Sequence, residues 1–139
     1  MKEVKGLTFR HALDFSLSGD QVCPKVIGSE EAWKVCPGVY VVFEDSQLVY
    51  IGSYNYGMRY RWIRKREGEV YHFKRPNVMG SLKNGKTVKL FAEDEAKLKE
   101  QLSQQDNPWV NAAGIEAYLV GGCGFELPWN KKGKKKNRA

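Results

Sequence analysis

One carboxylate stands alone in a long uncharged part of the chain. Glu116 is the only charged residue between Asn107 and Phe125. Its neighbours are typical of a buried helix: Ala112, Ala113, Ile115, Leu119 and Val120. An unpartnered buried carboxylate is costly, so we expect Glu116 to be paired, hydrogen-bonded or metal-bound. A lone carboxylate near positive charge would suit one Mg²⁺ held mainly by water and a substrate phosphate. A structural ion pair, or a place on the helix's one wet side, would explain it without chemistry.

Positive charge is concentrated in two places. The formal net charge of the 139 residues is +7, but the last nine residues carry +6, so residues 1–130 carry only +1. Within residues 59–75 seven basic residues oppose Glu67 and Glu69, a net of +5. They are Arg59, Arg61, Arg64, Lys65, Arg66, Lys74 and Arg75. Such clusters favour a polyanionic partner such as nucleic acid, although a solubilising tail and a solvated helix face would carry the same charges.

Two short β-branched and aromatic runs predict a β-hairpin. The runs are GVYVVF at 38–43 and LVYIG at 48–52, separated by four polar residues. A loop with an odd number of residues would place Val39 opposite Ile51, Val41 opposite Val49, and Tyr40 opposite Tyr50. One face would then be aliphatic, and the two phenols would lie side by side, about 5 Å apart at Cβ.

The remaining pattern predicts the elements around this hairpin. Residues 1–28 show weak periodicity, and residues 53–57 read as a turn. We expect one further strand over 86–92, and helices over 29–35, 57–66, 76–84, 93–104 and 110–120. Gly85 and the Gly121-Gly122 pair are expected to end two of these helices. The predicted fold is α+β, with a small three-stranded, mainly antiparallel sheet flanked by helices.

Length and composition restrict the class of protein. One domain is expected, and the apolar content of 42% is that of a globular chain that needs no disulfide or metal to fold. No apolar run is long enough for a membrane span, and the first ten residues lack a secretory core. The three cysteines, Cys23, Cys36 and Cys123, have no metal-type spacing and are read as reduced thiols of a cytosolic protein.

These motifs together resemble those of the GIY-YIG nucleases. GVY at 38–40 and YIG at 50–52, with nine residues between the tyrosines, are similar to the paired signature of that family. Arg61 in YRW lies where the family has its catalytic arginine, Glu116 where it has its metal-binding glutamate, and Asn130 in PWN where it has an asparagine. The resemblance covers residues 37–130. Within the family, the chain is most similar to the small phage endonuclease II and restriction-type members.

Two positions depart from the family pattern. Ser53 follows YIG where many members have lysine, and Lys65 stands four residues after Arg61 where many have histidine or tyrosine. Tyr60, Tyr71 or His72 could supply the missing group from a shifted position. His11 lies outside the motif and is assigned no role.

The resemblance implies a metal-dependent DNA endonuclease that uses one divalent ion, Mg²⁺ or Mn²⁺. Glu116 would bind the ion and Arg61 would stabilise charge on the phosphorus. Tyr40 would act as general base, although an ordinary phenol, with a pKa of about 10, needs help from Arg61 or Lys65 to do so. Tyr50 would position the water or phosphate, and Asn130 would fix the surroundings of the glutamate. The implied DNA-binding residues are Arg59, Arg64, Lys65, His72, Lys74, Arg75, Lys131, Lys132, Lys134, Lys135 and Lys136.

This interpretation divides the chain into an N-terminal extension over 1–36, a nuclease domain over 37–130 and a basic, disordered tail over 131–139. The expected partner is double-stranded DNA in the cytoplasm of a prokaryotic or phage-infected cell, with no membrane and with a homo-oligomer left open. Two alternatives remain: a catalytically inactive GIY-YIG module that binds DNA, and a small basic RNA-binding protein, for which exposed stacking aromatics would be expected.

Overall fold

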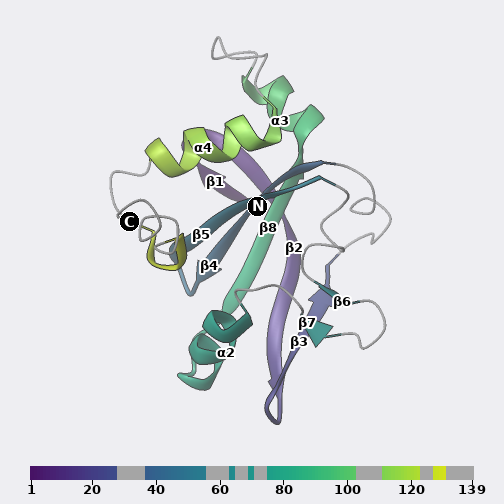
Figure 1. Ribbon diagram of the computed structural model, residues 1–139, viewed down its shortest axis with the longest axis vertical. Coiled ribbons are helices and arrows are strands. Elements are labelled where there is room, and N and C mark those ends of the chain that lie inside the picture. Colours follow the sequence, from purple (N-terminus) through teal and green to yellow (C-terminus); the bar gives the residue numbers. More distant parts are fainter. Residues whose placement is uncertain are drawn as a thin grey trace, which may run out of the picture.

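A six-stranded antiparallel sheet organises the described part of the chain. The computed structural model describes residues 1–27, 37–55, 63–64, 69–70, 75–102, 111–122 and 127–130. The sheet contains β1 (Lys2–Val4), β2 (Leu7–Ser18), β3 (Gln21–Val26), β4 (Gly38–Glu44), β5 (Gln47–Tyr54) and β8 (Val88–Asp94). The order is β1-β2-β8-β4-β5, with β3 also paired to β2, and every pair is antiparallel (Figure 1). The predicted α+β class with an antiparallel sheet flanked by helices is confirmed.

The predicted number of strands is wrong, because residues 2–26 form three strands that the sequence did not reveal. The reason lies in β2, whose pairing with β8 shifts register between His11 and Leu13. Before this irregularity Leu7 and Phe9 face one core, and after it Leu13 and Phe15 face the other. A bulge therefore interrupts the two-residue alternation by which a strand is recognised in a sequence.

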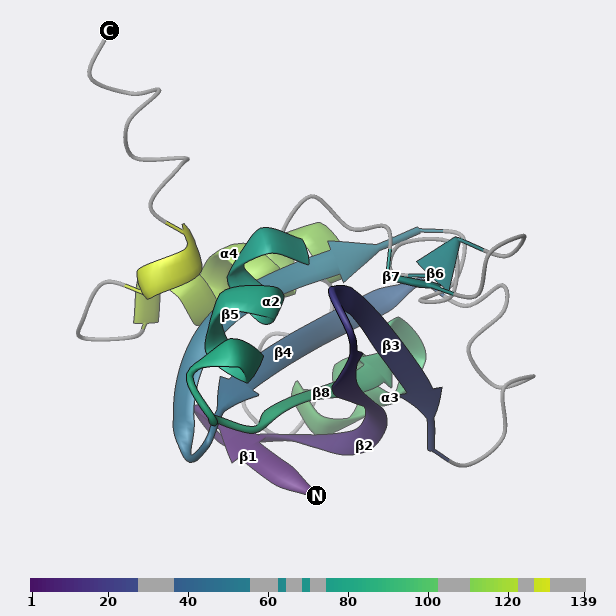
Figure 2. The same cartoon turned by 90° about the horizontal axis from the view of Figure 1, so that it is seen from below.

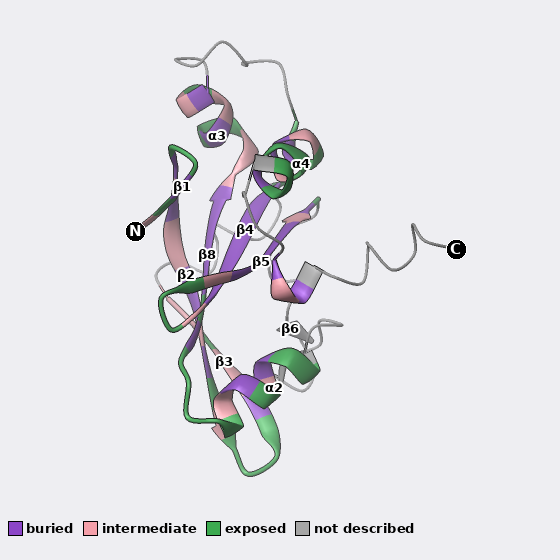
Figure 3. Cartoon of the chain, turned by 90° about the vertical axis from the view of Figure 1, so that its left-hand side faces the viewer, coloured by how far each residue is buried: buried purple, intermediate pink, exposed green. Residues whose placement is uncertain are grey.

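The sheet has a hydrophobic core on each face, because β4 alternates between them. Tyr40 and Val42 belong to one core, and Val39 and Val41 to the other. The tyrosine core, as we call the first, contains Ala12, Leu13, Phe15, Val22, Tyr40, Val42, Val49, Tyr50, Tyr54, Val78, Val88, Leu90, Ala92 and Trp129. The second core includes Leu7, Phe9, Val39, Val41, Ile51 and Phe91. Strands β4, β5 and β8 are buried along most of their length (Figure 3).

Three helices cover these faces at the predicted places. Helix α2 (Arg75–Lys83) packs on the tyrosine core through Val78 and ends before Gly85, whose φ is +78°. Helices α3 (Glu95–Leu102) and α4 (Ala112–Gly122) pack on the second core through Leu98, Ile115 and Leu119. Helices α3 and α4 lie toward one end of the sheet, and α2 lies toward the other (Figure 1). Gly121 and Gly122 form the last residues of α4.

The hairpin exists, but its predicted register is wrong. Val41 pairs with Ile51, Tyr40 with Gly52 and Val42 with Tyr50. The turn has an even number of residues, Asp45-Ser46 between Glu44 and Gln47, whereas the predicted register required an odd number; Asp45 has φ +55°. A register shift between Val42 and Phe43 adds one residue on the β5 side. That bulge restores the alternation, so both tyrosines still lie on one face.

The helix predicted over 57–66 is contradicted at its C-terminal part. Ile63–Arg64 forms β6, which pairs with β7 (Glu69–Val70) in a separate two-stranded sheet. Residues 57–62 and 65–66 lie outside the described residues, as does the helix predicted over 29–35. No helix in the described ranges has the length and apolar content needed to cross a bilayer.

The last described segment connects the two cores. Leu127 is buried in the second core, and two residues later Trp129 is buried in the tyrosine core. The 3₁₀ turn η3 (Pro128–Asn130) contacts β5, beside which it lies in Figure 2. The PWN segment therefore anchors the C-terminal end of the domain to both faces of the sheet at the β5 side.

Candidate functional site

The two tyrosines of the motif lie next to each other on one face of the hairpin. The ring centroids of Tyr40 and Tyr50 are 5.9 Å apart with an interplanar angle of 41°. They are diagonal neighbours, because the residue directly opposite Tyr40 is Gly52. Both side chains are buried, Tyr40 completely and Tyr50 to a relative exposure of 6%. The expected pairing of the phenols is thus achieved through a different register.

The glycine of the YIG motif provides the space for Tyr40. A methyl group on Gly52 would overlap the Tyr40 hydroxyl, and the other nearest atoms to it also belong to that ring. The phenol therefore lies flat against the bare backbone of the neighbouring strand. This close approach explains why a glycine follows the second tyrosine by two residues.

A third tyrosine continues the row. Tyr54 is the last residue of β5, and its ring centroid is 6.4 Å from that of Tyr40, with an interplanar angle of 20°. Its partner in register is Gly38, where a methyl group would overlap the Tyr54 hydroxyl and the Glu93 carbonyl. The sequence analysis missed Tyr54 because it assigned residues 53–57 to a turn. The available signal was the even spacing of Tyr50, Gly52 and Tyr54, which places all three on one face of a strand.

An ion pair between half-buried Arg10 and buried Glu93 joins β2 to β8 near this end of the row. Glu93 accepts hydrogen bonds from Arg10 Nε at 3.0 Å and Nη2 at 2.8 Å, and one from the Asp94 backbone N–H at 3.0 Å. The hydrogen bond to Glu93 is the main cause that raises the pKa of Arg10; the charges of Glu93, Asp94 and nearby Tyr54 add to it, and burial opposes it. Both Glu93 oxygens are engaged, so this buried carboxylate is a structural partner of Arg10.

Glu116 lies on α4, the helix that packs on the second core. It is half-buried at the middle of α4, whose contact with the second core is made by Ala112, Ile115 and Leu119. The opposite side of the helix is exposed and apolar, with Ala113, Ala117, Tyr118, Val120 and Gly121. Two of the residues expected to be buried, Ala113 and Val120, are therefore on the wet side. In the described part of the chain Glu116 makes no hydrogen bond or ion pair.

The motif tyrosines and the helix that carries Glu116 lie on opposite faces of the sheet. The tyrosines face the tyrosine core, whereas α4 packs on the opposite face against Val39, Val41 and Ile51. Asn130 closes η3 directly after Trp129, and only its backbone is described.

Most of the predicted basic residues cannot be placed. Arg64 lies in β6 and Arg75 begins α2, with the backbone alone described. The others lie outside the described residues: Arg59, Arg61, Lys65, His72, Lys74, Lys131, Lys132, Lys134, Lys135 and Lys136. Tyr60 and Tyr71, the other candidate substitutes for the family's histidine or tyrosine, lie there too.

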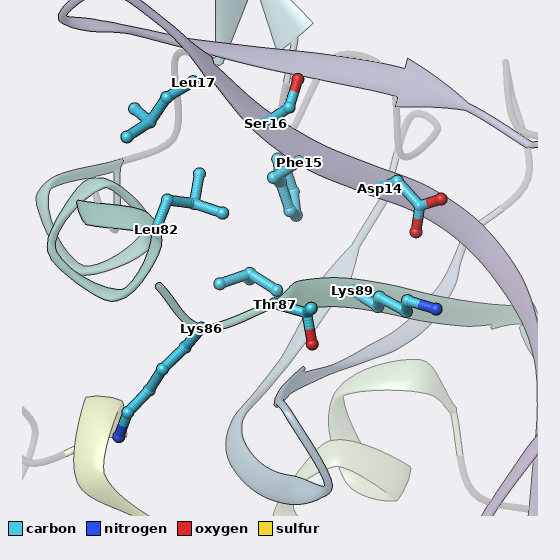
Figure 4. Close-up of a pocket in the computed structure, with 9 residues that line it drawn as sticks. Asp14, Phe15, Ser16, Leu17, Leu82, Lys86, Thr87 and Lys89 are labelled. Carbon is cyan, nitrogen blue, oxygen red and sulfur yellow. The ribbon is translucent and has the colours of Figure 1, made fainter. Parts of the chain in front are cut away.

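A pocket of about 370 Å³ lies between β2, the end of α2 and the start of β8. The side chains of Phe15, Leu17 and Leu82 point toward its interior, whereas the amino groups of Lys86 and Lys89 point away (Figure 4). Among the described residues, the pocket lining includes none of the predicted site residues. The pocket is therefore distinct from the tyrosine row.

Comparison with known proteins gives one similarity, to a solved structure. No family model matches it, and no curated protein matches it. Among solved structures it is similar to a mutant of the bacteriophage T4 protein EndoII, with a TM-score of 0.45 and 17% sequence identity. The match covers 73% of this chain and 91% of the other. A similarity at this level assigns no function.

Proposed function

We propose that the chain is a metal-dependent DNA endonuclease that hydrolyses phosphodiester bonds with a single divalent ion, Mg²⁺ or Mn²⁺. The observation that carries the proposal is the pair of motif tyrosines, in contact on one sheet face, with the Tyr40 phenol lying on the YIG glycine. In this arrangement the GVY and YIG residues together place two phenols side by side on one face of the hairpin. The order of Arg61, Glu116 and Asn130 after the hairpin supports the same interpretation.

The residues present fit a singly ligated metal ion. Glu116 is accessible on α4 and, among the described residues, has no hydrogen bond or ion pair that would compete for its oxygens. No group of three metal-ligating side chains occurs in the described ranges. A site with one protein carboxylate suits Mg²⁺, which keeps several waters and uses substrate phosphate as a ligand. Such an ion, when bound, would neutralise charge on the scissile phosphate.

The proposed roles of the protein groups follow from their chemistry. Glu116 would hold the ion, and Arg61 would place positive charge beside the phosphorus as the water oxygen bonds to it and the bond to the leaving oxygen breaks. Tyr40 accepts the proton of the attacking water, and Tyr50 orients that water or the phosphate. Asn130 supports the site from η3. The basic residues of 59–75 and 131–136 bind the backbone of double-stranded DNA.

One observation favours a second candidate. Tyr40 is fully buried, and a general base must reach the proton that it removes. A module that keeps the hairpin for stability and binds DNA without cutting it would show the same burial. The proposed nuclease therefore requires the Tyr40 hydroxyl to become accessible when DNA binds.

A nicking assay separates these candidates. Supercoiled plasmid is incubated with the purified full-length chain in Mg²⁺, in Mn²⁺ and in EDTA, and binding of duplex DNA is measured in EDTA. Cleavage with either metal, lost in EDTA, supports the endonuclease. Duplex binding without cleavage supports the inactive module, and preferential binding of single-stranded RNA supports the RNA-binding alternative.

A further inference from the structure

Tyr50, Tyr40 and Tyr54 form a row within the tyrosine core. The proposed base, Tyr40, is the middle one. Tyr40 has Tyr50 on one side at 5.9 Å and Tyr54 on the other at 6.4 Å, measured between ring centroids. Gly52 lies beneath its hydroxyl end. The Tyr40 ring therefore has Tyr50, Tyr54 and Gly52 as close neighbours.

From this geometry we infer that Tyr54 is a positioning residue of the proposed nuclease site, and the inference rests on that proposed function. Its ring fixes the orientation of the Tyr40 phenol and thereby the place of the reacting oxygen. The terminal torsion of a tyrosine is broad and has little preference of its own, so neighbouring groups decide the plane of the ring. Tyr54, at an interplanar angle of only 20°, is the neighbour most nearly parallel to Tyr40.

The backbone is shaped to hold Tyr54 as it holds Tyr40. Tyr40 lies over Gly52, its register partner, and Tyr54 lies over Gly38, its own register partner. The relative exposure of Tyr54 is 3%, so its ring is held by packing on the sheet. Gly38 of the GVY motif therefore leaves space for the Tyr54 ring, and Gly52 of the YIG motif leaves space for the Tyr40 ring.

The consequence for the reaction is a specific kinetic pattern. Tyr54 is buried and contacts Tyr40, so its loss should leave DNA affinity unchanged while it misplaces the proposed base. A displacement of about 1 Å at a reacting group costs on the order of 10²-fold in rate. The effect should fall on the cleavage step at saturating DNA.

The test compares Tyr54→Leu with Tyr54→Phe in the full chain, and uses Tyr118→Leu as the matched control. Tyr118 is a tyrosine on the exposed side of α4 with 44% relative exposure. We expect Tyr54→Leu to slow single-turnover cleavage by on the order of 10²-fold, with the Kd for DNA within about threefold. Tyr54→Phe keeps the ring and should retain cleavage within about threefold, and Tyr118→Leu should retain it fully.

A second readout does not depend on activity. In protein labelled with ¹³C in its tyrosine rings, Tyr54→Leu should shift the Tyr40 ring resonances and speed the flipping of that ring, whereas Tyr54→Phe should do so far less. If the wild type does not cleave DNA, the proposed function fails, and the resonances alone decide whether Tyr54 orients Tyr40. Equal cleavage by Tyr54→Leu and wild type, or an equal loss in Tyr54→Phe, would overturn the positioning role. Should Tyr54→Leu fail to fold, Tyr54→Met takes its place as the ringless variant of similar volume.

Discussion

Two substitutions test whether Tyr40 is the general base: Tyr40→Phe removes its hydroxyl, and Gly52→Ala displaces it. Tyr40→Phe removes one oxygen and should abolish cleavage without changing the unfolding midpoint. Gly52→Ala keeps the phenol but forces it to move, because all three atoms nearest to an added methyl belong to Tyr40. We expect its cleavage rate to fall by at least about 10²-fold. Plasmid nicking and thermal unfolding of both variants measure these effects.

The control for this pair is Tyr50→Phe. An inactive Tyr50→Phe beside an active Tyr40→Phe would make Tyr50 the base. If all the hydroxyl variants cleave normally, the row is a structural element of the core and the proposed mechanism is wrong.

Glu116→Gln tests the metal ligand. The substitution keeps the size and hydrogen-bonding capacity of a half-buried side chain but removes the charge that would hold a divalent ion. Cleavage should be abolished, while DNA binding in EDTA should stay within about threefold. Glu3→Gln, which removes an equal charge from the exposed position of β1, serves as the control. Mg²⁺-dependent nicking by purified Glu116→Gln would remove this residue from the site.

Arg61 is distinguished from its neighbours by its position after YIG. An oxyanion-type contact contributes roughly 3–4 kcal/mol, so Arg61→Ala should lower the cleavage rate by on the order of 10²–10³-fold. Arg64→Ala removes the same charge from a residue whose backbone lies in β6 and should weaken DNA binding instead. Equal rate losses at saturating DNA would mean that Arg61 is one member of a general basic patch.

At the scale of elements, the hairpin turn is held against the start of β8. The Asp45 carboxylate accepts hydrogen bonds from the Thr87 backbone N–H at 2.9 Å and from its hydroxyl at 3.1 Å. The Asp45 backbone N–H donates to the Thr87 carbonyl at 2.8 Å. The Thr87 N–H hydrogen bond is the main cause that lowers the pKa of Asp45; the Thr87 hydroxyl and the Lys86 charge act in the same direction, and desolvation opposes them.

The lowered pKa of Asp45 makes its contribution to stability larger at neutral pH than at acidic pH. A depressed carboxyl pKa stabilises the fold above the unfolded-state value of about 3.9, and this contribution is lost as the pH falls through the folded pKa. Asp45→Asn keeps a residue that tolerates the left-handed conformation at φ +55°. It should lower the midpoint of thermal unfolding at pH 7 by no more than about 4 °C, because the carboxylate is exposed. The difference from wild type should shrink below about pH 4; a constant difference from pH 7 to pH 3 would show that the charge contributes nothing.

The elements also show which parts of the fold can be read from the sequence. Helices α2, α3 and α4 were predictable because their signals are local: a glycine after α2, acidic residues in the first turn of α3, and a glycine pair at the end of α4. Strand β2 was not, because the register shift after His11 reverses which residues face each core. The hairpin register failed for a similar reason, since the shift between Val42 and Phe43 depends on pairing and leaves no mark in composition.

In the candidate site, too, features with a local sequence signal could be predicted, and features that depend on strand pairing could not. Tyr40 and Tyr50 were predicted as neighbours, but they share a face only because the register shift between Val42 and Phe43 offsets the two-residue turn. Tyr54 could not be, because it depends on how far β5 continues past Gly52, and the residues SYNYG have the composition of a turn. The solvent exposure of one side of α4 also escaped prediction, because a helix of small apolar residues has no polar face to reveal its orientation.

At the scale of the whole molecule, the charge distribution predicts how DNA affinity depends on salt. Deletion of residues 131–139 removes six positive charges and keeps Asn130 and the core. If those charges contact phosphates, the slope of log affinity against log salt should fall by roughly 0.9 per contact, up to about 5 units. Cleavage at low salt and saturating DNA should stay close to the full-length rate.

Two results would contradict this prediction. An unchanged salt slope would show that the tail serves solubility alone. A loss of cleavage at saturating DNA would show that the tail takes part in the active site.

The position of β8 between β2 and β4 has a consequence for how the protein is made. A ribosome synthesises β1 to β5 before the strand that joins them, because β8 begins only at Val88. Until it emerges, the nascent chain holds two separate antiparallel units, each with an unpaired edge at the place where β8 will be inserted. Exposed strand edges favour mispairing and aggregation during biosynthesis, and pairing over long sequence separations is slow. The interval between translation of Ser18 and of Val88 is therefore the period in which this protein most needs a chaperone.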